Sequence, residues 1–225
     1  MSAFLGPIHY WLYNKIRRVV EREQWVYEKA AALCSDTAEE LRAQAWQTYG
    51  EPLPDVALET LIDQGNIHGW LQRQITIAET REAALIKALI ETCGEGGREA
   101  VESAFREHGA ACGQKAAEES VTPVNGADQV YKLLNNYLLN GMPCDQADMV
   151  TENGSDKVCW ETTICLQEGN WRKAGVDEAF MKRLYQFWIG AFVEAVNPDF
   201  TYRQTADTVR GDRQNRHEIA GGGSQ

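Results

Sequence analysis

Two histidines recur in the same local sequence, and they are the first residues of this chain that could do metal or acid–base chemistry. The stretches 6–16 (GPIHYWLYNKI) and 65–75 (GNIHGWLQRQI) place His9 and His68 at equivalent positions. Each histidine is expected near the start of a helix, where the helix dipole disfavours a protonated ring. A neutral imidazole there could ligate a metal ion or haem iron, or act as a base. Alternatively, both rings stabilise helix ends or pack against the tryptophans that follow them.

Two of the six cysteines belong to the same repeated pattern. Cys34 and Cys93 each follow a repeated histidine by 25 residues, which is about 37 Å along a straight helix. If the two long helices pack antiparallel, each histidine approaches the cysteine of the other copy, and the pairs could bind a soft metal or activate a thiolate. The alternative is a pair of buried structural thiols.

A second group of cysteines lies in the C-terminal half of the chain. Cys144 follows Gly-Met-Pro in an expected loop, a position that suits a reactive thiol. Cys159 and Cys165 have the same parity in an expected strand, so they should share one face. An acid or base could be supplied by one of three residues: Glu161, Asp145 and His217. The alternative is two core cysteines and one loop cysteine.

Aromatic side chains and one arginine are candidates for holding a cofactor or organic ligand. Trp11 and Trp70 follow the repeated histidines and could line such a site or belong to the core. Arg203 could anchor a carboxylate, because a guanidinium binds a carboxylate with two hydrogen bonds. A structural ion pair is the alternative. The chain has no phosphate-binding loop, nucleotide fingerprint or serine elbow.

An internal duplication with an offset of 59 residues positions the first group of candidates. The same offset aligns six further identical pairs: Arg22/Arg81, Glu23/Glu82, Cys34/Cys93, Glu40/Glu99, Ala45/Ala104 and Gly50/Gly109. Apolar residues recur at helical spacing in both copies. We therefore expect two helix–turn–helix repeats, 6–50 and 65–109, packed about a pseudo-twofold axis.

Capping and helix-breaking residues predict where these helices begin and end. Pro7 suits the first position of the first helix, and Asn66 is a natural N-cap for its counterpart. Breaks are expected at 35–37 and 94–97. In both copies the second helix is expected to end at a glycine: Gly50 and Gly109.

The remaining part of the chain alternates between helical and strand patterns. The expected helices are 126–140 and 175–196, and the expected strands are 148–152, 157–165, 200–205 and 217–219. Asn153-Gly154 is a strong hairpin signal between the first two strands. This order predicts an α-β-β-α-β-β unit, and the whole chain is therefore expected to be an α+β protein. The expected parts are a helical bundle at 1–123, the smaller α+β unit at 124–220 and a flexible tail at 221–225.

Composition restricts the class of partner. The 225 residues carry 22 Lys and Arg against 33 Asp and Glu, a net charge of −11. This charge argues against nucleic acid and against anionic membranes. No apolar run reaches the length of a membrane span, and the N-terminus does not resemble a signal peptide. We expect a cytoplasmic protein with a small-molecule ligand and, as a further expectation, a homo-oligomer.

The C-terminal unit resembles the C-terminal part of the L-2-amino-thiazoline-4-carboxylic acid hydrolase-like family and, more distantly, the 4-vinyl-reductase-like ligand-binding domains. The resemblance covers about the last 90 residues and rests on a cysteine-bearing hairpin, a long helix and a common ending. That ending is Tyr202, Arg203, Thr205, Gly211, Asp212 and 217–219. Asn215 stands where the family pattern has a cysteine. The N-terminal duplication resembles uncharacterised proteins of anaerobic bacteria, which implies no activity.

These residues and resemblances support two function classes. The first is a small-molecule hydrolase in which a cysteine thiolate attacks a C–N or thioester-like bond of a carboxylate-bearing substrate. A histidine would act as the base, and Arg203 would bind the substrate carboxylate. This hypothesis rests mainly on the resemblance. The alternative is a non-enzymatic binding or sensory protein that holds haem, a transition metal or an apolar ligand through His9 and His68. A third hypothesis is a structural module that pairs with another subunit.

Overall fold

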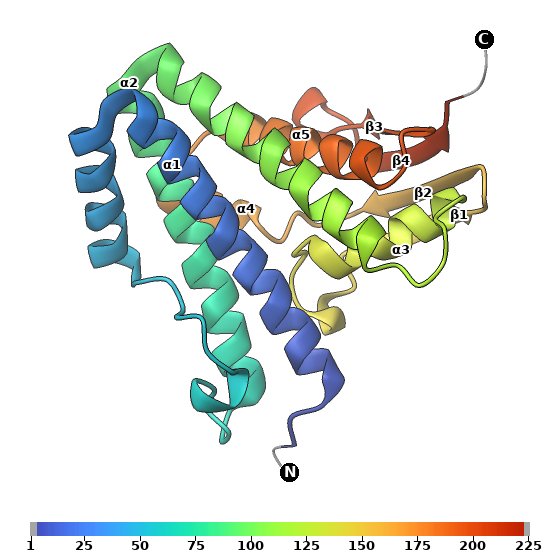
Figure 1. The fold of residues 1–225 in the computed structure, drawn as a ribbon, viewed down its shortest axis with the longest axis horizontal. Helices are drawn as coiled ribbons and strands as arrows, with labels where there is room; N and C mark the ends of the chain where they lie inside the picture. The colour runs from blue at the N-terminus through green and yellow to red at the C-terminus, as the bar shows by residue number, and fades with distance from the viewer. Residues whose placement is uncertain (1–3, 223–225) are drawn as a thin grey trace. The chain divides into compact units, whose positions relative to one another are not determined.

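The structure, a computed structural model, describes residues 4–222 and confirms the α+β class. The elements in chain order are α1 (Pro7–Tyr49), η1 (Leu58–Thr60), α2 (Ile67–Glu118), α3 (Ala127–Tyr137), η2 (Pro143–Asp145), β1 (Asp148–Asn153), β2 (Lys157–Thr162), α4 (Glu168–Ala174), α5 (Glu178–Val196), β3 (Phe200–Ala206), η3 (Thr208–Arg210) and β4 (Asn215–Gly221). They are shown in Figure 1.

The chain forms two compact units, and each is built from several segments. The first unit contains the residues up to Val101, together with 138–144 and 167–178. The second unit contains 102–137, 145–166 and the residues from Ala179 onward. This division differs from the expected boundary at 123/124, because α2 continues from one unit into the other and short segments from later in the chain belong to the first unit.

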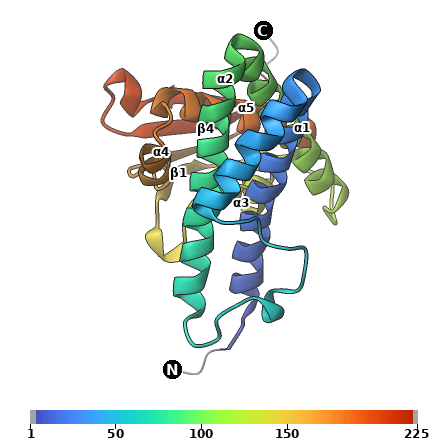
Figure 2. The same cartoon turned by 90° about the vertical axis from the view of Figure 1, so that its left-hand side faces the viewer.

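In the first unit, α1 and the first part of α2 lie side by side and run parallel (Figures 1 and 2). Both helices bury residues at alternating steps of four and three, the spacing of a coiled coil. In α1 these residues are Leu12, Ile16, Val19, Glu23, Val26 and Ala30; in α2 they are Leu71, Ile75, Ala78, Glu82, Leu85 and Leu89. Every member of the first set has its partner 59 positions later, so the two copies meet in register.

Both long helices bend at equivalent places, as the sequence predicts. Cys34 departs from helical geometry with φ −144° and ψ 59°, and Gly94 does so with φ 59° and ψ −136°. Gly94 thereby uses a left-handed conformation that favours glycine. Pro7 begins α1 as expected, and Asn66 caps α2 by accepting a hydrogen bond of 3.1 Å from the Gly69 amide.

The second helix of the second copy does not end near Gly109; α2 continues to Glu118. Gly109 and Gly113 are instead contact residues within the second unit. A Cβ atom on Gly109 would lie 2.4 Å from the carbonyl oxygen of Trp188, and one on Gly113 would lie 2.4 Å from that of Phe192. The glycines thus allow α2 and α5 to approach at backbone distance, the role that small residues have at close helix contacts.

The second unit has a four-stranded antiparallel sheet in the order β1-β2-β4-β3. The expected hairpin and the two C-terminal strands are confirmed. The inner face carries Val158, Trp160, Ile219 and Phe200, which are buried. The covering helices are α3, which packs on β2 and β4, and α5, which contacts α3 through Phe192 and Tyr137. The outer face is charged.

Three details differ from the sequence-based expectations. The strand β2 ends at Thr162, so Cys165 lies beyond it and does not share a strand face with Cys159. The short helix α4 precedes α5 and was not expected. Gly221 ends β4 and Gly222 donates a hydrogen bond of 2.7 Å to the Asp199 carbonyl, so the tail begins later than predicted; 223–225 lie outside the described residues.

Within residues 4–222, no helix combines the length and the apolar character that crossing a bilayer requires.

The close approach of α2 and α5 gives a first prediction. Gly109→Ala places a methyl group against the Trp188 carbonyl and should lower the free energy of unfolding by about 1–3 kcal/mol. Gly190→Ala is the matched control on α5, because its Cβ would have no neighbour nearer than Tyr202, at 4.0 Å. Urea denaturation followed by circular dichroism measures both variants. Equal stability of the two would contradict the packing role of Gly109.

Candidate functional site

The parallel register brings equivalent residues of the two copies face to face. The expectation that each histidine meets the cysteine of the other copy, which required antiparallel helices, is therefore wrong. His9 meets His68 at the starts of α1 and α2, with 3.3 Å between the two Nε2 atoms and 5.4 Å between the ring centroids. Cys34 and Cys93 meet at the bends of the same helices, where both line one cavity.

The hydrogen bonds of His9 define how the two rings share protons. The Gly6 amide donates to Nδ1 of His9 over 2.9 Å. A neutral His9 ring must then carry its proton on Nε2 and donate it to Nε2 of His68. Both rings are accessible, since His9 is half-buried and His68 is exposed. The pair thus stabilises a helix start, as one alternative predicted, and also presents two imidazole nitrogens at a single point.

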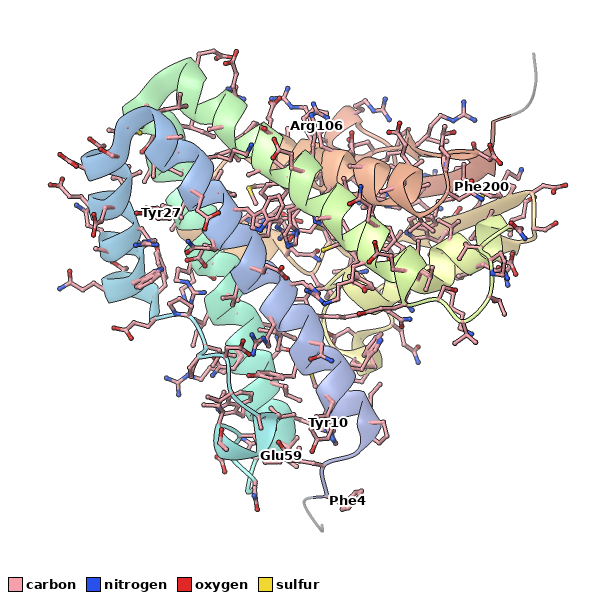
Figure 3. All side chains as sticks on the ribbon, in the orientation of Figure 1. Phe4, Tyr10, Tyr27, Glu59, Arg106 and Phe200 are labelled. Atoms are coloured by element: carbon pink, nitrogen blue, oxygen red, sulfur yellow. The ribbon has the colours of Figure 1, made fainter. Side chains whose placement is uncertain are left out.

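Other groups around this end of the first unit are already engaged. Tyr10 and Glu59 point toward each other (Figure 3), and the Tyr10 hydroxyl donates to the Glu59 carboxylate, which lowers the pKa of Glu59. The Lys15 ammonium lies over the Trp11 ring, with 3.5 Å between Nζ and the ring centroid. Trp11 and Trp70 both pack on the apolar core of the first unit. These contacts agree with the core alternative for the two tryptophans.

Two reciprocal ion pairs lie at the middle of the helix pair. The Arg22 guanidinium donates to both carboxylate oxygens of Glu82 at 2.7 Å. Arg81 binds Glu23 through Nε alone, which lies 3.0 and 2.7 Å from the two carboxylate oxygens. All four side chains are buried. We call this group the Arg–Glu pairs.

The surroundings of the Arg–Glu pairs are not symmetric. Glu23 accepts a further hydrogen bond of 3.0 Å from the Trp46 indole, and Arg81 donates over 3.1 Å to the Gly50 carbonyl. Burial raises the pKa of Glu23, while Arg81 opposes that shift. In the second copy of the repeat, Phe105 stands at the sequence position that matches Trp46. A phenylalanine cannot donate a hydrogen bond, so the second copy has no counterpart of the bond between Trp46 and Glu23. The two copies have therefore diverged in how they satisfy their buried charges.

Glu79 is a third buried carboxyl group of the first unit. Asn170 of α4 donates to its Oε2 over 2.6 Å, whereas Oε1 has no hydrogen-bond partner among the described residues. Burial, followed in smaller measure by the nearby Glu82 charge, raises the pKa of Glu79 to about 8. Glu79 is thus protonated in the folded protein at neutral pH, because its environment cannot solvate a second anion beside Glu82.

The Cys34 thiol is hydrogen-bonded to the backbone, and it is close enough to Cys93 to affect the pKa of that thiol. Cys34 donates over 3.3 Å to the Ala30 carbonyl. Burial and the hydrogen bond with Cys34 raise the pKa of Cys93 to about 11. Both sulfurs line a cavity of about 260 Å³ at the bends. A raised pKa leaves little thiolate at neutral pH, so this pair is not arranged as an activated nucleophile.

In the second unit, the predicted acid and base lie on opposite faces of the sheet. Glu161 is on the outer face, where it is ion-paired with Arg216. His217 is on the inner face, where its Nδ1 lies 2.9 Å from the Tyr202 hydroxyl and its ring stacks on Trp160 at 5.1 Å. Burial lowers the pKa of His217 to about 4. The Tyr202 hydroxyl is therefore hydrogen-bonded to a neutral imidazole.

The three cysteines of the second group lie in three different settings. Cys144 is exposed in η2, and Cys165 is half-buried after the end of β2. Cys159 lies on the outer face, where burial and the Glu152 charge raise the pKa of its thiol. The structure does not bring Glu161 and His217 together around one thiol, and the hydrolase function stays a prediction.

Arg203, the predicted carboxylate anchor, is engaged within the chain. Its guanidinium lies 2.6 Å from Glu218 on the outer face, and its side chain is 69 % exposed. This is the structural ion pair that the sequence left as an alternative. Among residues 4–222, no group of three or more His, Cys, Asp or Glu side chains could hold a metal ion, so the His9–His68 pair offers no more than two protein ligands.

Two features were not predicted from the sequence: the Arg–Glu pairs and the hydrogen bond between Tyr202 and His217. The first had a usable signal, since Glu23 and Glu82 interrupt apolar heptads at equivalent positions. The second had none, because Tyr202 and His217 become neighbours only through the pairing of β3 with β4.

Comparisons with protein-family models, curated proteins and solved structures gave no significant match. The resemblances inferred from the sequence stay predictions.

The Arg–Glu pairs give a second prediction. Arg22→Met leaves Glu82 buried without its partner and should lower the free energy of unfolding by about 3–5 kcal/mol. The double variant Arg22→Met/Glu82→Met removes both charges and should recover most of that loss. A double-mutant cycle by urea denaturation measures the coupling. Additive losses would contradict a direct interaction between the two side chains.

Glu79 gives a prediction about pH. Its folded pKa of about 8 lies above its ordinary value of 4.5, so the folded state holds a proton that the unfolded state releases. Stability must then fall as pH rises from 4.5 to 8, by up to about 1.4 kcal/mol per pH unit. His217, with a pKa lowered from 6.5 to about 4, acts oppositely but only below pH 6.5.

The useful window for this measurement is therefore pH 6.5–8. The free energy of unfolding of the wild type should fall across it, whereas that of Glu79→Gln should change much less, because a neutral amide replaces the titrating group. Parallel slopes for the two proteins would show that Glu79 is not the group responsible.

Proposed function

We propose that this protein is a metal-binding protein in which His9 and His68 chelate one transition-metal ion. The observation that carries the proposal is the distance of 3.3 Å between the two Nε2 atoms. Imidazole suits zinc, copper and nickel ions, and both rings are accessible from solvent. The duplicated sequence supplies the two ligands from two rigid, parallel helices.

The spacing fits chelation of a tetrahedral ion. With bonds of about 2.05 Å, two nitrogens on such an ion lie about 3.3 Å apart, and their ring centroids lie about 5.2 Å apart. The rings of His9 and His68 have a centroid separation of 5.4 Å. Binding through both Nε2 atoms replaces their mutual hydrogen bond, and a small rotation directs both lone pairs toward a shared ion. A neutral His9 that ligates through Nε2 carries its proton on Nδ1, so binding also replaces the hydrogen bond that the Gly6 amide donates to Nδ1 in the metal-free chain.

The same spacing favours a single ion over haem. Two imidazoles on opposite sides of a haem iron would hold their nitrogens about 4 Å apart, with the macrocycle between the rings. The His9–His68 contact leaves no room for that plane unless the helix starts separate.

Two protein ligands leave coordination positions open. Structural zinc sites are closed by four protein ligands, whereas open positions take water or an exogenous ligand. The protein would therefore bind and exchange its ion without catalysing a reaction. Water, a small molecule or a second copy of the chain would complete the coordination of the ion.

Zinc binding to the full chain tests the proposal. Isothermal titration and metal analysis after desalting should give one zinc ion per wild-type chain. His9→Gln and His68→Gln should each weaken binding at least about tenfold, and the double variant should add little, because both residues serve one ion. Gln keeps a polar side chain at each helix start. Zinc should also raise the thermal unfolding temperature of the wild type alone.

The matched control is Gln72→Ala, which alters an exposed side chain one turn beyond His68 on α2. It should bind zinc as the wild type does. A wild type that takes up no zinc, or histidine variants that retain wild-type affinity, would refute the proposal.

A further inference from the structure

We propose that Cys34 and Cys93 form a reversible intramolecular disulfide when the protein meets a low-molecular-weight disulfide, and that this bond cross-links α1 to α2 at their bends. This modification site lies at the opposite end of the helix pair from His9 and His68, and it does not depend on the proposed metal binding.

Register supplies the first argument. The residues that meet along the helix pair are separated by 59 positions for the histidines, and by 60 and 58 positions for the two Arg–Glu contacts. Cys34 and Cys93 are also 59 positions apart, and both line one cavity at the bends. The ion pairs that fix this register therefore hold the two sulfurs next to each other before any bond forms.

The local backbone supplies the second argument. A disulfide needs its two Cβ atoms within a narrow distance range, which two rigid, straight helices seldom satisfy. Here the bends at Cys34 and Gly94 fall directly at the thiols, and residues at a bend can adjust their backbone more easily than those inside a regular helix.

Access supplies the third argument. Both cysteines are half-buried, and the cavity of about 260 Å³ that they line is completed by Leu33, Thr37, Thr92, Gly96 and Gly97. None of these lining residues is charged, and four of them are threonine or glycine, so a short disulfide such as oxidised glutathione can reach one sulfur. Cys112, by contrast, is buried.

The chemistry balances as two exchange steps. A thiolate of one cysteine attacks the oxidant RSSR, so that a Cys–S–SR bond forms and RS⁻ leaves. The second thiol loses its proton and attacks the protein sulfur of that mixed disulfide, and a second RS⁻ leaves. Overall, two Cys–SH and RSSR give Cys–S–S–Cys and two RSH. The two cysteines are oxidised, RSSR is reduced, and the thiol protons pass to the released RS⁻ groups.

The test exposes the reduced full chain to oxidised glutathione in the presence of EDTA, so that bound metal does not contribute. Remaining thiols are then alkylated, and the chain is digested with trypsin. Cleavage after Lys29 and Arg42, and after Lys87 and Arg98, places Cys34 in peptide 30–42 and Cys93 in peptide 88–98. We expect these two peptides joined, an intact mass lower by about 2 Da from the bond itself, and monomeric mobility on a non-reducing gel.

Single variants distinguish the mechanism from general thiol reactivity. In Cys34→Ser the second step has no partner, so Cys93 should remain as a glutathione adduct, and Cys93→Ser should trap Cys34 likewise. Cys144→Ser, which removes an exposed thiol elsewhere in the first unit, should still form the cross-link. Oxidised wild type should unfold at a higher temperature than reduced protein, because the bond restricts the unfolded chain, and dithiothreitol should reverse the shift.

Three results would overturn the proposal in a chain that circular dichroism shows to be folded. These are recovery of peptides 30–42 and 88–98 only as separate alkylated species, recovery of both only as separate glutathione adducts, and a link between them found only in dimers. None of these results bears on zinc binding at His9 and His68.

Discussion

The two buried Arg–Glu pairs hold the helix pair of the first unit in one register, and its other features depend on that register. Apolar heptads alone would also tolerate a slip of seven residues, because the buried positions repeat with that period. Such a slip would leave two arginines and two glutamates buried without partners, a cost of several kcal/mol. The register in turn decides which side chains face each other at both ends of the pair.

The identity of each facing pair depends on chemistry as well as on symmetry. Arginine and glutamate are adjacent in the sequence, so each charged residue finds the opposite charge on the other helix. Histidine and cysteine have no such neighbour, so each meets its own kind. Two imidazoles facing each other can share a proton or an ion, and two thiols can share a proton or a covalent bond. The helix pair therefore has a neutralised centre, an imidazole end and a thiol end.

Much of the fold was predictable because its signals are local. Periodicity and capping gave the repeats, and the hairpin dipeptide gave β1 and β2. The direction of the helices was not predictable, since an apolar stripe shows which face is buried but not which way the neighbour runs. Gly109 was misassigned because a helix-ending glycine and a helix-contact glycine look alike in sequence. Cys165 was placed on a strand face by parity, which holds only as far as the strand extends. The partners of Glu79 and His217 come from distant segments.

The tandem repeat also means that both halves of each facing pair belong to one molecule. In a dimer of separate chains, paired histidines and paired cysteines would separate on dilution, and their occupancy would depend on how much protein is present. Within a single chain, the effective concentration of one helix at the other is set by the connecting segment and is independent of protein concentration. The facing pairs therefore do not depend on how many copies of the protein a cell contains.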